Sequence, residues 1–162
     1  MVSFLKKFGS KVRVPGALRC RSTTQRERGP VAEFAVVRER IAAVRIAATP
    51  TALDAARWPA DATELRLAPD EVLLLDVLDA AAPEPHAIVF PDTGWVRFVL
   101  SPAAGTRVFE GAATWPPPAH GLGQGAIAGI PAKVIVNTDC WWLVVQGVLA
   151  DDFEDRLVEV LA

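Results

Sequence analysis

Short apolar runs of strand length, each bounded by turn-forming residues, recur along the chain between residues 43 and 146. Runs this short and this closely spaced leave no room for long helices, and they favour antiparallel strands joined as hairpins. Beyond a short helical turn before Pro59, helices are expected in this part of the chain only after Ser101 and at the C-terminal end. We therefore expect an α+β fold in which helices pack on one face of an antiparallel sheet.

The strands are predicted largely in pairs. A first strand is expected at 43–48, followed by a short helical turn that ends at Pro59. Alternate side chains of the strand at 95–100 point to opposite sides, and one of those sides is predicted to be core. Three hairpins are expected, at 64–77 around an Ala-Pro-Asp-Glu turn, at 86–100 around a Pro-Asp-Thr-Gly turn, and at 132–147 around an Asp-Cys pair.

The first longer helix is predicted to begin at Ser101 and Pro102. The serine hydroxyl can cap free backbone N–H groups, and proline lacks the N–H that has no partner at the first helical position. The helix is expected to run to about Glu110, and the three prolines and three glycines of 112–125 then predict an irregular loop.

The chain is expected to end in an amphipathic helix at 150–162. Its apolar stripe comprises Phe153, Leu157, Val160 and Leu161. From Trp95 onward the predicted order is therefore β, α, β, β, α, which matches much of a split βαβ, ferredoxin-like sandwich.

Charge is distributed unevenly along the chain. The net charge is −2, but residues 1–45 hold eleven Lys and Arg against three Glu, whereas residues 46–162 hold six against sixteen acidic residues. An acidic body argues against an extended nucleic-acid face, because binding phosphates requires clustered cations. No apolar run approaches the roughly 20 residues that span a bilayer. We therefore divide the chain into a basic N-terminal arm at 1–30 and one domain at 31–162 that is long enough to bury a core.

The basic arm has three interpretations. It has no acidic residue before Arg26, and Leu5, Phe8 and Val12 recur at helical spacing. This composition is typical of a mitochondrial transit segment, while a surface tail of a protein in the bacterial cytoplasm and a retained arm that docks on an anionic partner stay open. Contact with RNA would use the cations Lys6, Lys7, Lys11, Arg13, Arg19 and Arg21.

Four segments carry a resemblance to a known family. They are RLAPDEVLLL (66–75), WVRFVLSPAAGTRVFEG (95–111), AGIPAKVIV (128–136) and LVVQGVLADDFEDRLVEVL (143–161). Together they resemble the gamma subunit of heterotetrameric sarcosine oxidase, a small relative of the folate-binding aminomethyltransferase domain. The family's L-x-P-D-E-W-L-L turn is met except that Val72 replaces the tryptophan, and its L-S-G-P-A-A junction is met without the glycine.

The resemblance implies a domain of aminomethyltransferase type that acts as a non-catalytic structural or accessory subunit beside larger flavin- and folate-carrying partners. Two alternatives stay open. One is a folate-dependent protein of one-carbon chemistry, with folate as its cofactor, and the other is an accessory subunit of a nucleoprotein complex that contacts RNA through the arm. A complete aminomethyltransferase requires a chain more than twice as long, so the sequence favours a role without catalysis.

No catalytic, cofactor-binding or metal-binding constellation is predicted. His86 and His120 fall on different elements with no serine or cysteine motif beside them. Cys140 is expected to be a small packing residue in a turn. Residues 123–128 spell GxGxxA but lack the strand-to-helix context that a dinucleotide site requires. The acidic residues of the C-terminal helix are expected on its solvated face.

The tryptophans are the feature that suggests a binding role. The chain has five Trp and no Tyr, and Trp115 begins a rigid Trp-Pro-Pro-Pro segment that loses little entropy on docking. Adjacent Trp141 and Trp142 must face opposite sides of their strand, so one of them needs cover from outside the sandwich core. We predict a protein interface formed by Trp115, Pro116, Pro117, Pro118 and one of this pair; cover by the chain itself is the equal alternative.

Overall fold

The computed structural model describes residues 36–162. Its strands are β1 (Val36–Ile41), β2 (Ala43–Ala47), β3 (Thr63–Ala68), β4 (Glu71–Leu75), β5 (Ile88–Pro91), β6 (Trp95–Leu100), β7 (Gly121–Ile127), β8 (Ile130–Val136) and β9 (Trp141–Gln146). Its helices are α1 (Pro50–Ala55), α2 (Pro102–Ala112) and α3 (Ala150–Leu161), and a 3₁₀ turn, η1 (Gly147–Leu149), precedes α3.

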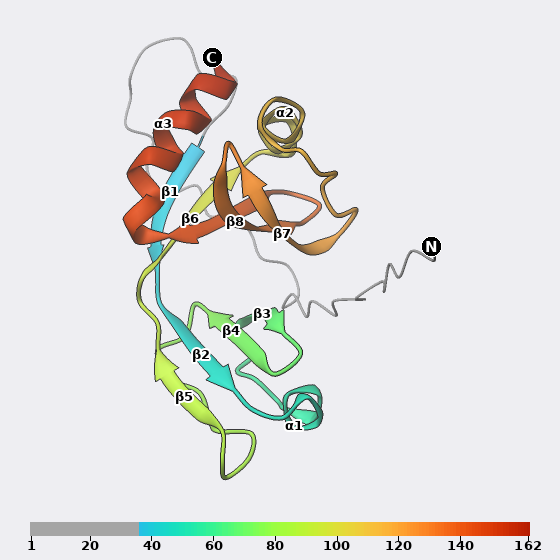
Figure 1. Ribbon diagram of the computed structural model, residues 1–162, viewed down its shortest axis with the longest axis vertical. Coiled ribbons are helices and arrows are strands. Elements are labelled where there is room, and N and C mark those ends of the chain that lie inside the picture. Colours follow the sequence, from blue (N-terminus) through green and yellow to red (C-terminus); the bar gives the residue numbers. More distant parts are fainter. Residues whose placement is uncertain (1–35) are drawn as a thin grey trace, which may run out of the picture.

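The strands form two antiparallel sheets (Figure 1). Sheet A has five strands in the order β1-β6-β9-β8-β7, and sheet B has four in the order β3-β4-β2-β5. The expected α+β class with antiparallel strands is therefore confirmed. The expectation of one sheet was wrong, because the segments before Trp95 build a second sheet of their own.

A nearly continuous stretch of chain connects the two sheets. β1 pairs with β6 in sheet A, and after Ala42 the chain continues as β2, which pairs with β4 and β5 in sheet B. The Ala42 carbonyl accepts a 2.9 Å hydrogen bond from the Asp76 amide at the end of β4. A backbone hydrogen bond therefore stabilises the point where the chain passes from sheet A to sheet B.

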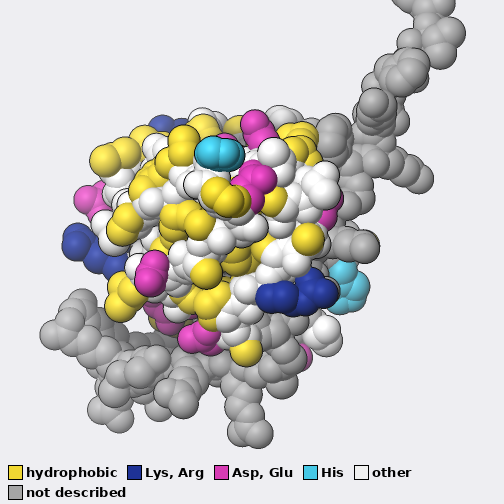
Figure 2. All heavy atoms as spheres, turned by 90° about the horizontal axis from the view of Figure 1, so that it is seen from below, with side chains coloured by type: hydrophobic (Ala, Val, Ile, Leu, Met, Phe, Trp, Pro, Cys, Tyr) yellow, Lys and Arg dark blue, Asp and Glu magenta, His cyan; other side chains and the backbone are white. Residues whose placement is uncertain are grey.

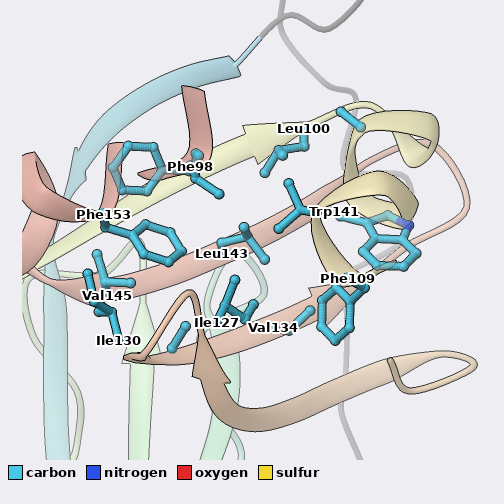
Figure 3. Close-up of a cluster of buried hydrophobic side chains, with 14 of the residues drawn as sticks. Phe98, Leu100, Phe109, Ile127, Ile130, Val134, Trp141, Leu143, Val145 and Phe153 are labelled. Atoms are coloured by element: carbon cyan, nitrogen blue, oxygen red, sulfur yellow. The ribbon is translucent and has the colours of Figure 1, made fainter. Parts of the chain in front are cut away.

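Helices α2 and α3 cover one face of sheet A (Figure 1). Apolar side chains from the sheet and both helices fill the space between them (Figure 3), and Phe98 meets Phe153 edge to face with ring centroids 5.3 Å apart. Each fully buried large side chain contributes roughly 1.5–3 kcal/mol relative to its exposed state. The predicted stripe of α3 is confirmed, with Phe153 and Leu157 completely buried.

The opposite face of sheet A packs against sheet B. Trp95 and Trp142 of sheet A share a buried cluster with Leu73 and Leu75 of sheet B. Both faces of strand β6 are thus core, whereas the sequence predicted only one. On the far face of sheet B, Leu53 of α1 packs into a third, smaller cluster.

The predicted helix start is confirmed. Ser101 Oγ accepts a 3.2 Å hydrogen bond from the Ala104 amide, and Pro102 occupies the first turn of α2. The hairpins expected at 64–77 and 132–147 are confirmed as well, and they correspond to β3–β4 and β8–β9.

The predicted pairing of 86–90 with 95–100 was wrong. Strand β5 pairs with β2 in sheet B, and β6 pairs with β1 and β9 in sheet A. The Asp92 amide donates to the Ala43 carbonyl at 2.7 Å, while the Gly94 carbonyl accepts from the Gly147 amide at 2.6 Å. The Pro-Asp-Thr-Gly segment therefore carries the chain from sheet B to sheet A instead of forming a hairpin turn.

Two strands were not predicted. Strand β1 lies before the first strand expected from the sequence, and β7 occupies the end of the segment expected to be an irregular loop. Glycine weakens a strand and offers no side chain to pack, which is why this segment resembled a loop. Its glycines have a packing role that appears only in three dimensions.

Candidate interaction surface

Trp115 lies in the connection between α2 and β7, on the helix-covered side of sheet A. Its ring meets that of Phe109 edge to face, with centroids 5.0 Å apart. Its indole Nε1 donates a 2.9 Å hydrogen bond to the Ala126 carbonyl. Trp115 is half-buried, so one part of the ring extends the core and another part remains open to solvent.

Gly123 and Gly125 of β7 make room for this ring. A Cβ on Gly123 would stand 2.9 Å from Trp115 Cζ3, and one on Gly125 would stand 2.5 Å from Trp115 Nε1. Neither distance is compatible with a real side chain. The glycines of the GxGxxA pattern thus leave a flat strand surface on which the indole packs. The pattern lies in an antiparallel hairpin, whereas a dinucleotide site requires a strand-to-helix turn.

The prolines after Trp115 form the outer part of the same feature. Pro116 and Pro117 are exposed, whereas Pro118 is half-buried beside Gly123. The loop is therefore anchored by Trp115 and Pro118 and presents two rigid apolar residues outward. We call Trp115 and Pro116–Pro118 the tryptophan-proline loop.

Both members of the tryptophan pair are buried by this chain, so for this pair the structure shows the alternative of cover by the chain itself. Trp141 lies under α2, against Gly105 and 5.5 Å from the Phe109 ring (Figure 3). Trp142 faces sheet B, with the Arg97 guanidinium 4.3 Å from its ring centroid. The second sheet supplies the cover that the sequence could not reveal. Of the residues predicted to form an interface, those of the tryptophan-proline loop are at least partly exposed. Contact of this loop with a partner stays a prediction.

Ion pairs line the seam between the sheets. Arg97 of sheet A binds Glu39 at 2.7 Å and Asp76, which follows β4, at 2.8 Å. Arg45 of sheet B binds Glu71 at 2.8 Å and Asp92 at 2.9 Å. Each arginine thus holds two carboxylates, and sequence reasoning identified neither group because the partners are distant in the chain.

Among residues 36–162, Lys133 has no carboxylate at ion-pair distance, unlike the two arginines of this seam. Its Nζ donates to the Gln124 side-chain oxygen at 3.1 Å and lies 5.9 Å from the Trp95 ring centroid. Burial, together with the positive charge of Arg45, lowers the pKa of Lys133, and Glu71 opposes the shift. The Trp95 indole N–H nearby is buried and has no hydrogen-bond partner within the described part of the chain.

The remaining candidate residues do not converge. His86 and His120 are both exposed, and they lie before β5 and before β7 respectively. Cys140 is buried at the start of β9 in the seam, as a packing residue would be. Across residues 36–162, no group of three His, Cys, Asp or Glu is arranged to hold a metal ion. Within the same residues, no helix is long and apolar enough to cross a membrane.

Three acidic residues of α3 take part in surface ion pairs. Arg38 of β1 binds Asp151 and Glu154, each at 2.7 Å, and Arg156 binds Asp152 at 3.0 Å. The two contacts of Arg38 fasten β1 to α3, and the acids lie on the solvated side of the helix, as expected from the sequence.

Comparison with solved structures defines the fold class. The chain is similar to a chain of the heterotetrameric sarcosine oxidase from Corynebacterium sp. U-96, solved in complex with pyrrole 2-carboxylate, with a TM-score of 0.60 at 16% sequence identity. The similarity covers 79% of this chain and 83% of that chain. No family model and no curated protein matches. This protein therefore shares its fold with a subunit of a heterotetrameric complex.

Proposed function

We propose that this protein is a non-catalytic structural or accessory subunit of a larger protein complex, of the kind represented by the gamma subunit of heterotetrameric sarcosine oxidase. The observation that carries the proposal is the shared fold over four-fifths of both chains. Because nearly equal shares are covered, the two chains are similar in length. As part of the same proposal, we assign the fold to a domain of aminomethyltransferase type.

The chemistry of the described residues supports this role. At the seam, Arg97 and Arg45 are committed to ion pairs with two carboxylates each. Rigid apolar surface is accessible at Pro116 and Pro117 of the tryptophan-proline loop. Rigid aromatic and proline residues bind other proteins at low entropic cost. The loop is thus our proposed contact with a larger subunit.

Recovery of the complex tests this proposal. The endogenous protein would be purified with its co-eluting chains, in parallel with a Trp115→Ala variant and a Pro116→Asp, Pro117→Asp variant. We expect at least a several-fold loss of the larger chains with both variants, because each removes docking surface.

A Pro59→Asp variant is the matched control, since Pro59 is an exposed proline in another loop. The double proline variant guards against misfolding, because its two positions are exposed and Trp115 stays in place. Full recovery of the larger chains with that variant would exclude the loop as the contact.

The alternative roles remain predictions. The arm at 1–30 lies outside the described residues. Its roles as a transit segment or an RNA contact, and the location of the protein that they imply, therefore stay predictions. No described contact favours folate as a cofactor over the structural role, and calorimetry with folate would decide that alternative. Strong salt dependence of association would indicate the nucleoprotein alternative.

A further inference from the structure

Lys133 lies at the margin of the seam between the sheets. It stands directly opposite Gln124 in the β7–β8 ladder and on the same face of β8 as Ile135, which packs in the seam. Its side chain is half-buried, whereas Gln124 and Pro131 beside it are exposed. Figure 2 views the sheet B end of the molecule and shows basic side chains only toward the margin of the described surface. Lys133 is the only lysine among residues 36–162, and its amine lies where the seam meets solvent.

The surroundings of this amine do little to stabilise a positive charge. Its Nζ donates to the neutral side-chain oxygen of Gln124 at 3.1 Å, and no described carboxylate lies within ion-pair distance of it. The Trp95 ring centroid lies 5.9 Å from Nζ and 6.0 Å from the Arg45 guanidinium, so two cations lie near one indole. The indole N–H is a donor and adds no acceptor. An ammonium group at this place is therefore poorly compensated.

The charged groups around Lys133 are already paired with one another. Glu71 and Asp92 bind Arg45 at 2.8 and 2.9 Å, and Arg97, further along the same face of sheet A, holds two carboxylates of its own. Burial lowers the pKa of Lys133 most, Arg45 lowers it further, and Glu71 opposes the shift. At neutral pH a larger fraction of this amine is therefore uncharged than in a solvated lysine. The uncharged amine is the form that attacks a carbonyl carbon.

An acylated Lys133 suits these surroundings better than the ammonium does. The amide that forms keeps one N–H on Nζ, which is all that the hydrogen bond to Gln124 requires. The amide carries no charge, so the cost of burial and the repulsion from Arg45 are both removed. A lysine that holds an ion pair would lose it on acylation, whereas Lys133 has no such pair within the described part of the chain.

We propose that Lys133 is an acylation site, at which the side-chain amine takes a small acyl group from a thioester or an acyl phosphate. The uncharged nitrogen forms a bond to the carbonyl carbon, and the bond from that carbon to sulfur or to the phosphate oxygen breaks. The nitrogen gives up one proton, and a thiol or a phosphate leaves with the electron pair of the broken bond. The inference goes beyond the proposed accessory role and does not depend on it.

Treatment of the full chain with acetyl phosphate and, separately, with the small thioester N,S-diacetylcysteamine tests the site and distinguishes the two donors. Peptide mass spectrometry would follow acetylation at several pH values. An Arg107→Lys variant supplies a reference amine, because position 107 is exposed on α2. At pH 7 we expect Lys133 to react at least about threefold faster than the introduced lysine with one donor or both. The ratio should fall as pH approaches 10.5.

Two substitutions of neighbouring residues should act in opposite directions. Glu71→Gln removes the carboxylate that favours the ammonium, so we expect Lys133 to react about twofold faster or more at pH 7. Arg45→Met removes the opposing cation and frees Glu71, so we expect a reaction about twofold slower or more. Thermal unfolding would show whether each variant is folded. Glu71→Gln keeps the test decisive if Arg45→Met does not fold, because Arg45 then still holds Asp92.

Acetylation of Lys133 should also stabilise the fold, because it removes a desolvated charge. We expect the melting temperature of the acetylated chain to rise by about 2 °C or more. Lys133→Arg, treated in parallel, is the control, because it keeps the charge at 133 and takes the same acetyl groups on Lys6, Lys7 and Lys11.

The proposal is overturned if Lys133 reacts with neither donor, or no faster at pH 7 than the lysine introduced by Arg107→Lys. A Glu71→Gln variant that fails to react faster would overturn it as well, and so would a melting temperature that rises no more than in the Lys133→Arg control. The assay needs no complex, so its failure is separate from failure of the Trp115 co-purification test.

Discussion

Lys133 shows at the scale of a single residue what it costs to place a cation in the seam between two sheets. Its lowered pKa has two causes, first burial and then the neighbouring positive charge of Arg45. In the window between the folded-state pKa and the usual lysine value of 10.5, the unfolded chain binds more protons than the folded one. The free energy of unfolding therefore rises with pH through that window. Below the window, the protonated lysine destabilises the fold to its full extent.

A Lys133→Met variant removes this dependence. We expect the variant to be more stable than the wild type at neutral pH, because the apolar stem remains while the desolvated charge is lost. The difference should narrow as pH rises toward 10.5. Denaturant unfolding of both proteins at several pH values checks this, and a difference that stays constant with pH would contradict the assignment.

At the scale of elements, the contact between α2 and β9 is set by a single glycine. A Cβ on Gly105 would stand 2.6 Å from Trp141 Cε3, in the middle of a buried ring that cannot move aside. Alanine improves intrinsic helix stability by about 1 kcal/mol over glycine. Overpacking a well-filled core costs typically about 1–3 kcal/mol, or more, and should win here.

We therefore expect Gly105→Ala to lower the free energy of unfolding by up to about 2 kcal/mol, after the helix gain is subtracted from the overpacking cost. Gly94→Ala is the control, because its added Cβ would meet nothing nearer than Asp92 Oδ1 at 3.8 Å. Urea unfolding measures both. A stabilised Gly105 variant would show that the helix and sheet are less tightly packed than the structure indicates.

Elements whose determinants are local could be predicted from the sequence. The cap at Ser101 and the β8–β9 hairpin each depend on a few neighbouring residues, so they were recognised correctly. The pairing of β5 and β6 was missed, because alternation along a strand is satisfied by any partner on either sheet. Strand β7 was missed because its glycines serve a tryptophan ring that approaches from outside the strand.

The candidate site was predictable to a similar extent. The sequence identified the tryptophan-proline loop from composition alone, and the structure keeps its two outer prolines exposed. It could not show that Trp142 is covered by a second sheet, since that cover comes from residues far away in the chain. For the same reason, the Arg97 ion pairs, up to 58 positions apart in sequence, left no local signal.

At the scale of the whole molecule, Arg97 joins the two sheets. Its side chain is only 13% exposed, and Arg97→Met would leave Glu39 and Asp76 as half-buried carboxylates without a cation. Removing one partner of a buried pair costs about 3–5 kcal/mol; the partial exposure of these acids reduces our expectation to about 2 kcal/mol. Denaturant unfolding measures the loss.

A triple variant serves as the internal test of this assignment. Adding Glu39→Gln and Asp76→Asn to Arg97→Met leaves no unpaired carboxylate, so part of the lost stability should return. Arg107→Met is the surface control, because Arg107 is exposed on α2 and should change stability by no more than about 0.5 kcal/mol. Equal losses for Arg97→Met and Arg107→Met would contradict the role of Arg97 as the link.

The native mass and activity of the endogenous protein test the accessory-subunit proposal most directly. Native mass spectrometry of the gently purified protein should show this chain in fixed stoichiometry with larger chains, while the isolated chain turns over no substrate of that assembly. A single-chain species that converts a small substrate unaided would contradict the proposal.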